Sequence, residues 1–154
     1  MASVTRAACV LAALALAAAC GPKVADTTAA PGTTTPKKPR KAPAKVAQVN
    51  ATGEPVDLAN VLVPGHVTVV DFWATWCGGC EVVDQRLMAS IAKESRVVVR
   101  KIDVGDGDTP VARQHKVGAL PHVRIYDRDG NLRYVLAGND ALTAGDAAKT
   151  LAAE

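Results

Sequence analysis

The chain has 154 residues, a length that accommodates one domain of ordinary size with some sequence to spare. Its formal net charge of +3 combines two oppositely charged parts: residues 20–49 carry six Lys and Arg against one Asp, whereas residues 50–154 carry eleven against fourteen Asp and Glu. The basic excess lies in a Pro-, Thr- and Lys-rich segment and not on a predicted folded face, so the composition argues against a nucleic-acid-binding protein.

The N-terminus has the pattern of an export signal, with Arg6 followed by a short apolar run and small residues. The run is about half of the ~20 residues that a membrane-spanning helix needs, so residues 1–19 are predicted to be a signal peptide. Residues 16–21, Leu-Ala-Ala-Ala-Cys-Gly, resemble the lipobox of bacterial lipoproteins, although Ala17 stands where that motif prefers Leu. The resemblance implies that Cys20 carries a lipid anchor; simple signal cleavage is the alternative.

The next segment, residues 20–45, is predicted to be a lipid-anchored or free disordered linker. Proline recurs every few residues, which prevents both helix and strand pairing, and little apolar sequence is available to form a core. Such a linker is semi-extended and would hold a domain over residues 46–154 away from a membrane. The expected location is therefore extracytoplasmic (periplasmic) and membrane-anchored.

Residues 46–154 are predicted to form one α/β domain, in which helices flank a central mixed sheet and a β-hairpin precedes it. The predicted elements are a hairpin of strands 46–50 and 55–58, a buried strand over 67–72, a helix from 78 to about 94, a strand over 97–104, a short helix to 115, a hairpin of strands 123–126 and 132–136, and a final helix from 143. Continuous β-branched runs indicate the buried strands and helical spacing of apolar residues indicates the long helix. Thr109 before Pro110 predicts an N-cap, and Thr143 with Asp146 predicts a capping box.

The cysteines give the sharpest indication of chemistry. Cys9 would leave with the signal and Cys20 is the lipid candidate, which leaves Cys77 and Cys80 as a Cys-x-x-Cys pair where a strand meets a helix. Unpaired N–H groups at a helix start stabilise a thiolate, and a spacing of three lets the second sulfur resolve a mixed disulfide. A structural disulfide would close only a tiny loop, and a zinc site needs four ligands whereas the histidines are scattered. Redox chemistry is therefore favoured.

Three motifs resemble the thioredoxin family. Residues 69–80, VVDFWATWCGGC, resemble its signature; residues 117–121, VGALP, resemble its loop with a cis proline; and residues 141–145 resemble the start of its last helix. The likeness covers residues of about 66–154 and implies the thioredoxin fold and protein-disulfide oxidoreductase activity without a cofactor. Residues 53–58 resemble instead the first hairpin of membrane-anchored periplasmic thioredoxins that serve cytochrome c maturation, whose usual insertion is absent.

The resemblance also implies residue roles. Cys77 would be the exposed attacking thiolate and Cys80 the more buried resolving thiol. Asp71 would relay a proton to or from the resolving thiol, with a pKa raised by burial, and Lys101 is either its partner or an ordinary surface lysine. The residues predicted to contact substrate are Trp76 beside the dithiol, Leu120 through backbone pairing, Pro121 with a cis peptide bond, and His122.

Three positions depart from the family pattern. Gly79 replaces the proline usual between the cysteines, and Glu81 follows the dithiol where a cation is common. His122 stands where threonine is usual, and is expected either to interact with the thiolate or to be an ordinary rim histidine. His66 and His115 are predicted to lie at the surface.

The predicted function is disulfide exchange with exported proteins, with the chain acting as a reductant and as a monomer. Its expected partners are protein disulfide substrates, a redox partner protein and a membrane reached through Cys20, but no nucleic acid. One alternative is a Cu(I)-binding, chaperone-like module that uses the same two cysteines, Cys77 and Cys80, with His122 as an optional third ligand. Another is a partner-docking lipoprotein with a vestigial dithiol. No residue fixes the direction of exchange.

Overall fold

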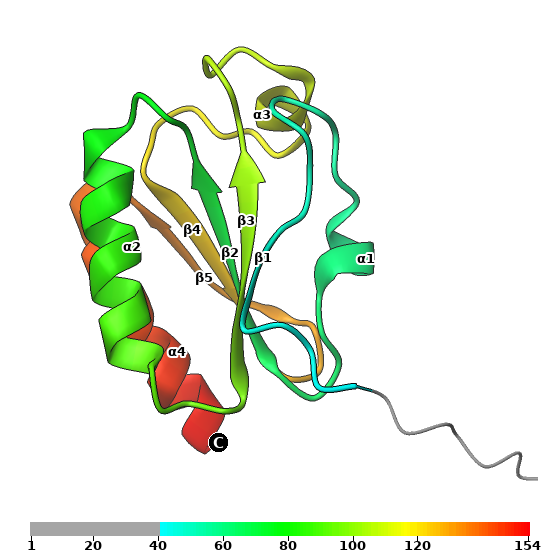
Figure 1. Cartoon of the computed structure of the whole chain (residues 1–154), viewed down its shortest axis with the longest axis vertical. Coiled ribbons are helices and arrows are strands. Elements are labelled where there is room, and N and C mark those ends of the chain that lie inside the picture. The colour runs from blue at the N-terminus through cyan, green and yellow to red at the C-terminus, as the bar shows by residue number, and fades with distance from the viewer. Residues whose placement is uncertain (1–40) are drawn as a thin grey trace, which may run out of the picture. The chain divides into compact units, whose positions relative to one another are not determined.

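The computed structural model describes residues 41–154 (Figure 1). The predicted signal peptide, Cys20 and most of the predicted linker lie outside these residues. The elements are β1 (Val46–Gln48), α1 (Leu58–Val61), β2 (Val67–Trp73), α2 (Gly78–Ile91), β3 (Val97–Asp103), α3 (Pro110–Gln114), β4 (His122–Tyr126), β5 (Leu132–Ala137), the 3-10 helix η1 (Gly138–Thr143) and α4 (Ala144–Ala153). Within residues 41–154, none of the helices is both long enough and apolar enough to cross a bilayer.

The five strands form one mixed sheet in the order β1-β3-β2-β4-β5. β1, β3 and β2 run parallel, β4 is antiparallel to β2, and β5 is antiparallel to β4. The run from Val67 to Phe72 in β2 is buried throughout, as its β-branched sequence predicts for a central strand covered on both faces. The predicted mixed sheet is confirmed.

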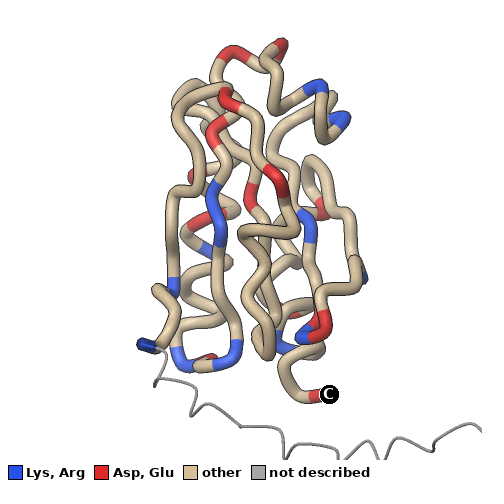
Figure 2. The backbone as a smooth tube through the Cα atoms, turned by 90° about the vertical axis from the view of Figure 1, so that its right-hand side faces the viewer, with Lys and Arg blue, Asp and Glu red and all other residues tan. Residues whose placement is uncertain are grey.

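Charged residues are unevenly distributed along the domain. In the side view of Figure 2, Asp and Glu are more frequent in the upper half of the tube, whereas Lys and Arg gather at the lower end, where the described chain begins. Charge is therefore separated along the length of the domain, with a more acidic upper half and a more basic lower end, although the total charge is small.

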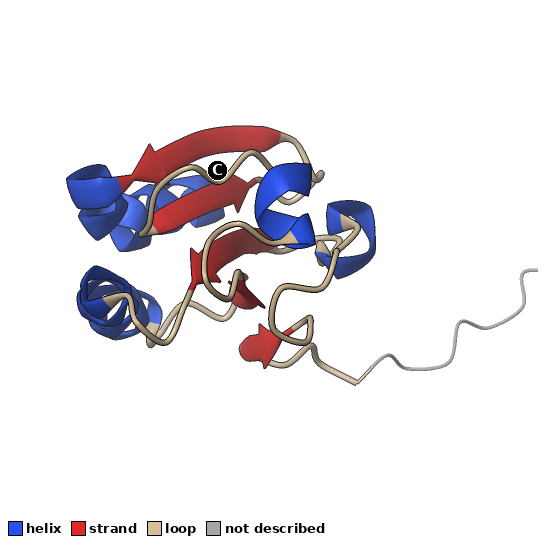
Figure 3. Ribbon diagram, turned by 90° about the horizontal axis from the view of Figure 1, so that it is seen from above, coloured by secondary structure: helices blue, strands red, loops and turns tan. Residues whose placement is uncertain are grey.

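Helices cover both faces of the sheet, as the view from above shows (Figure 3). One apolar cluster packs the sheet against α2 and α4, and the other packs the opposite face against α1 and α3. The largest fully buried side chains are Phe72, Leu87, Ile91, Ile102 and Ile125. Because both clusters meet on β2, this strand is the most constrained part of the structure and a rigid support for the loop at its carboxyl end.

Alternation along β2 decides which side chains can meet. Val69 belongs to the cluster under α2 and α4, whereas Val70 and Phe72 belong to the cluster under α1 and α3. Asp71 is two residues from Val69, so it projects toward α2. Lys101 lies directly beside it in β3, in register on the same face.

The predicted N-terminal hairpin is wrong. β1 pairs in parallel with β3, and residues 55–58 form no strand. The side chain of Asn50 accepts a hydrogen bond from Asp103 N–H at 2.9 Å and donates one to its carbonyl at 3.0 Å, which ties the end of β1 to the end of β3. Pro55 has no N–H to offer a ladder, and Asp57 instead caps α1 by accepting from Ala59 N–H at 3.0 Å.

The predicted capping box at the last helix is also wrong. Thr143 has helical backbone angles because it ends η1, and its hydroxyl donates to the carbonyl of Asp140 at 2.7 Å. Asp146 pairs with Lys149 at 2.8 Å and accepts from the Ser90 hydroxyl at 3.3 Å. The Thr109 cap of α3 is confirmed, since its hydroxyl accepts from Ala112 N–H at 3.5 Å.

Candidate active site

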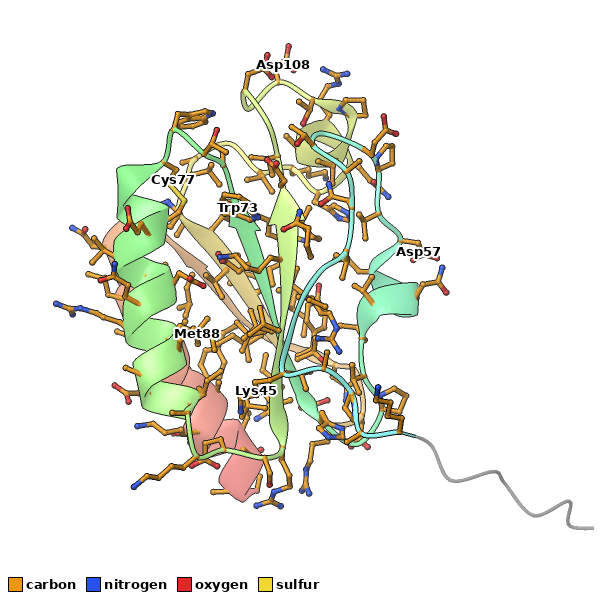
Figure 4. The ribbon with its side chains drawn as sticks, viewed as in Figure 1. Lys45, Asp57, Trp73, Cys77, Met88 and Asp108 are labelled. Atoms are coloured by element: carbon orange, nitrogen blue, oxygen red, sulfur yellow. A yellow bond between two sulfur atoms is a disulfide. The ribbon has the colours of Figure 1, made fainter. Side chains whose placement is uncertain are left out.

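The dithiol lies where β2 gives way to α2, at the upper end of the helix in Figure 4. Cys77 and Cys80 are joined by a disulfide, with their Cα atoms 5.3 Å apart. Cys77 is 9% exposed and Cys80 is 3% exposed. Cys80 is the more buried of the two, as predicted, whereas Cys77, which was predicted to be exposed, is itself buried in this disulfide-bonded state.

The first turn of α2 provides the polar environment of the Cys77 sulfur. Cys77 is the N-cap of this 14-residue helix, and its Sγ accepts a hydrogen bond from Cys80 N–H at 3.1 Å. The four N–H groups that begin a helix have no partner within it, and together they favour negative charge. The geometry therefore favours the thiolate form of Cys77 once the disulfide is reduced.

Three predicted substrate-contacting residues, Trp76, Leu120 and Pro121, lie in the loops around the dithiol. Trp76 is 60% exposed, and its indole N–H donates to the carbonyl of Gly105 at 2.7 Å. That bond fixes one edge of the ring against the loop after β3 and leaves the rest available for contact.

The second loop carries the Leu120-Pro121 peptide bond, which is cis as predicted. A Cβ added to Gly79 would lie 3.4 Å from Pro121 Cδ, so the proline ring packs against the turn between the two cysteines. Leu120 is half-buried, and the backbone hydrogen bonds of the described loops include none for it. Its backbone is therefore available to pair with an extended segment, as predicted.

Behind the dithiol, the Asp71 carboxyl is buried, and neither oxygen has a hydrogen-bond partner among the described residues. Burial raises the pKa of Asp71 to about 6; the Lys101 ammonium acts in the opposite direction, and the charge of Asp84 acts with burial. The predicted direction is confirmed. A carboxyl group that titrates near neutrality can both take and give a proton at physiological pH.

Lys101 is the partner of Asp71, but it is shared. Its Nζ lies 3.8 Å from Asp71 Oδ2, an ion-pair distance longer than a hydrogen bond, and 3.0 Å from Asp84 Oδ1. The same ammonium lies 5.0 Å from the centre of the Trp73 ring, whose N–H donates to Gln48 at 3.1 Å. Lys101 is therefore held by Asp71 and Trp73 on β2 and by Asp84 on α2.

A cavity of about 240 Å³ beside the dithiol extends to Lys101, Asp84 and Trp73. Its lining includes Trp73, Cys77, Cys80, Glu81, Asp84 and Lys101. A larger cavity of about 720 Å³ lies between the connection from α1 to β2 and the turn from β4 to β5, and no predicted site residue lines it. The smaller cavity is therefore the one relevant to the predicted chemistry.

The structure does not bring His122 to the dithiol. His122 is paired with Phe72 across β2 and β4, so its ring lies on the α1–α3 face, 5.4 Å from the Phe72 ring centre. It is 8% exposed and its Nε2 accepts from Arg124 Nε at 3.3 Å, so it is not a rim residue either. Burial lowers the pKa of His122, and the Arg124 cation adds to the effect. A neutral, buried histidine that is held between Phe72 and Arg124 is not suited to contact substrate.

His115 is not the surface residue that the sequence predicts. It is half-buried, its ring centre lies 5.5 Å from that of Phe72, and its Nε2 lies 2.9 Å from the carbonyl oxygen of Val56. Burial lowers the pKa of His115. Within residues 41–154, no three Cys, His, Asp or Glu side chains gather closely enough to bind a metal ion.

Sequence reasoning missed Asp84 and the role of Trp73 in holding Lys101. The signal for Asp84 was present, because it stands four residues after Cys80 and therefore shares its face of α2. Trp73 ends a strand whose register with β3 cannot be read from one sequence alone.

Comparison with known proteins is consistent with this site. The sequence profile of the family described as Thioredoxin matches residues 58–146. The thioredoxin of Echinococcus granulosus is 33% identical over 73 residues, which are 47% of this chain and 67% of that protein. The bifunctional thioredoxin reductase/thioredoxin of Mycobacterium leprae is 39% identical over 70 residues, 44% of this chain and 15% of that protein. The crystal structure of oxidized mitochondrial thioredoxin 3 from Saccharomyces cerevisiae superimposes with a TM-score of 0.51 and 28% identity, covering 61% of this chain and 87% of that one.

Proposed function

The chain belongs to the thioredoxin family and is a protein-disulfide oxidoreductase, and we propose that it reduces disulfide bonds of exported proteins from a membrane-anchored position. The observation that supports this proposal most directly is the hydrogen bond from Cys80 N–H to Cys77 Sγ at the start of α2. It directs the charge-stabilising end of a helix at the sulfur that must attack.

The reaction begins from the reduced dithiol. The Cys77 thiolate attacks one sulfur of a substrate disulfide, the substrate S–S bond breaks, and the first substrate sulfur leaves as a thiolate. Cys80 then loses its proton and attacks Cys77 Sγ, which forms the intramolecular disulfide and releases the second substrate sulfur. Two electrons pass from the cysteine pair to the substrate, and the protein ends in the state that the structure shows.

Loops around the dithiol are suited to bind an extended substrate. The exposed face of Trp76 offers apolar contact, and the backbone of Leu120 offers hydrogen bonds in the manner of an added strand. Pro121 lies against the turn between the cysteines, so a segment paired at Leu120 would pass close to the dithiol. We therefore assign substrate contact to Trp76, Leu120 and Pro121.

The reducing direction is supported by the relatives, which are named thioredoxins, and by one that is named bifunctional thioredoxin reductase/thioredoxin. A reductase or a comparable electron donor is the corresponding redox partner. Residues 53–58 give this direction no support, because the hairpin on which their resemblance depends does not form.

Export and anchoring are supported by the sequence of residues 1–45, with its signal-like start, its lipobox-like Cys20 and its Pro-rich linker. The copper-binding alternative gains no support from residues 41–154, since no group of three Cys, His, Asp or Glu side chains gathers there and His122 does not line the cavity beside the cysteines.

The function is tested by reduction of insulin disulfides with a chemical dithiol as the electron source. The parent chain should accelerate the reaction, and Cys77→Ser should lower the rate by about 100-fold or more because the nucleophile is lost. Cys80→Ser should also stop turnover but should trap a mixed disulfide on Cys77, visible by mass spectrometry.

Equilibration with glutathione gives the reduction potential of the pair and tests the direction. A reduction potential near that of thioredoxin, about −270 mV, would support the proposal that the chain acts as a reductant. A strongly oxidising potential contradicts the direction, and a parent chain as inert as Cys77→Ser contradicts the function and supports a vestigial dithiol.

A further inference from the structure

Asp84 is a charged group in the active-site cavity to which the reaction above gives no role. It projects from α2 and makes an ion pair with Lys101 at 3.0 Å, whereas Lys101 lies 3.8 Å from Asp71. Asp71 has no hydrogen-bond partner among the described residues. In the oxidised state, therefore, Lys101 lies closer to Asp84 than to the buried carboxyl group, with which it keeps only the longer ion pair.

The three groups form a series from the protein interior to the solvent. The side chain of Asp71 is 1% exposed, that of Lys101 is 20% exposed and that of Asp84 is 33% exposed. Lys101 and Asp84 line the same cavity as the two cysteines, so water that enters this cavity can reach both. This arrangement can connect the buried carboxyl with bulk water.

We propose that Asp84 is a positioning residue for disulfide exchange, which holds the Lys101 ammonium away from Asp71 and so keeps that carboxylate free to take the proton of Cys80. The inference rests on the proposed function and adds a second carboxylate to its proton-transfer step. Asp84 acts through Lys101 and is not itself in contact with the reacting sulfurs.

The step concerned is resolution of the mixed disulfide. The Cys80 thiol gives its proton to the Asp71 carboxylate, and its electron pair forms the bond to Cys77 Sγ. The bond from Cys77 to the substrate sulfur breaks, and the substrate leaves as a thiolate. The proton on Asp71 then passes to the departing thiolate or to water in the cavity, which restores the carboxylate.

Replacing Asp84 changes Asp71 in two ways that have the same sign. It removes a nearby negative charge, and it frees the Lys101 ammonium to approach the buried carboxylate; both favour the charged form of Asp71 and lower its pKa. The remaining charged group in the lining of this cavity is Glu81, also on α2, which makes no ion pair with Lys101 among the described residues. Glu81→Gln is therefore a matched control that removes the same charge from the same cavity.

The test is a titration of the Asp71 carboxyl carbon by NMR in the purified full chain, with the resonance assigned from its absence in Asp71→Asn. In Asp84→Asn the midpoint should fall by about half a pH unit or more. Asp84→Glu should restore it toward the parent value, and Glu81→Gln should shift it much less than Asp84→Asn. Thermal unfolding of each variant verifies that the fold is kept.

The kinetic counterpart is the pH dependence of single-turnover insulin reduction by the pre-reduced chain. Asp84→Asn should move the acidic limb of the rate profile to lower pH and reduce the rate of the resolving step severalfold on the plateau.

An unchanged midpoint and profile in Asp84→Asn would falsify the inference, and so would an equal shift in Glu81→Gln, which would indicate a general charge effect. A parent chain that does not reduce insulin overturns the proposed function instead, while the NMR titration still reports whether Asp84 controls Asp71.

Discussion

A buried carboxyl group with no hydrogen-bond donor costs folding free energy, and Asp71 is such a group. Its pKa of about 6 in the folded chain lies above the ordinary value of 3.8. The folded state therefore binds this proton more tightly than the unfolded state does. As a result, the contribution of Asp71 to stability declines as the pH rises from about 4 to about 6, and the penalty remains at higher pH.

Replacing Asp71 by Asn should therefore stabilise the fold at neutral pH. At pH 7.5 the free energy of unfolding should rise by up to about 3 kcal/mol, since each pKa unit corresponds to about 1.4 kcal/mol. Near pH 3.5 the difference should vanish, because the Asp71 carboxyl group of the parent is then largely neutral in both the folded and the unfolded state. Urea unfolding of parent and variant at the two pH values measures the difference. A gain of equal size at both would contradict a titration origin, and insulin reduction should slow because the proton acceptor is gone.

For a single residue, the sequence predicts burial and the direction of a pKa shift where a motif and the hydrophobic pattern around it agree. Asp71 follows four buried β-branched strand residues, and its burial and raised pKa could be expected from that position. His122 and Asp84 could not be placed, because their surroundings depend on the register of β4 with β2 and of α2 with β3. A shift of one residue in β4 would have turned His122 toward the other face.

Elements were predictable where their hydrophobic pattern is continuous. β2, β3 and α2 carry apolar runs that bury them on at least one face, and their observed bounds lie within about three residues of expectation. The segment over residues 46–58 has no such run, so side-chain hydrogen bonds decide its path. The bonds from Asn50 to Asp103 hold β1 alongside β3 instead of permitting a hairpin.

The contact between α2 and α4 depends on one glycine. A Cβ added at Gly145 would lie 2.5 Å from Ser90 Cβ and 2.8 Å from its Oγ, closer than atoms can approach without movement of the helices. Gly145→Ala should destabilise the fold by about 1–3 kcal/mol, measured by chemical unfolding. Gly118→Ala, at a position with no atom within 4 Å, is the matched control and should change stability by less than about 1 kcal/mol. Similar losses in both variants would mean that the helix contact is not the cause.

For the molecule as a whole, the sequence separates a basic N-terminal segment from a mildly acidic domain. Figure 2 shows a further separation within the domain, whose Lys and Arg gather toward the end where the described chain begins. Basic groups near an anionic lipid surface are attracted weakly, by about 1 kcal/mol each, so this end of the domain is suited to lie toward a membrane.

The anchoring proposal predicts where the chain is found in a bacterial host. The parent should fractionate with membranes and yield an N-terminal peptide that begins at lipid-modified Cys20, because several acyl chains hold a protein stably at a bilayer. Cys20→Ser should move the protein to the soluble fraction without loss of insulin reduction by the purified chain. An unmodified N-terminus that begins elsewhere, with soluble parent protein, would rule out the lipid anchor.

The separation of Cys77 from Lys45 along the domain determines which part of it can meet a substrate. In Figure 4, Cys77 lies in the upper part of the domain, and Lys45, through which the chain leaves toward its N-terminus, lies below it. If the proposed anchor and linker hold the domain by its N-terminal side, Cys77 would face away from the bilayer and be accessible to an approaching substrate protein. The length of the predicted linker would then set how far from the membrane the domain can bind substrates. The dithiol would already face them, so the domain would not have to rotate.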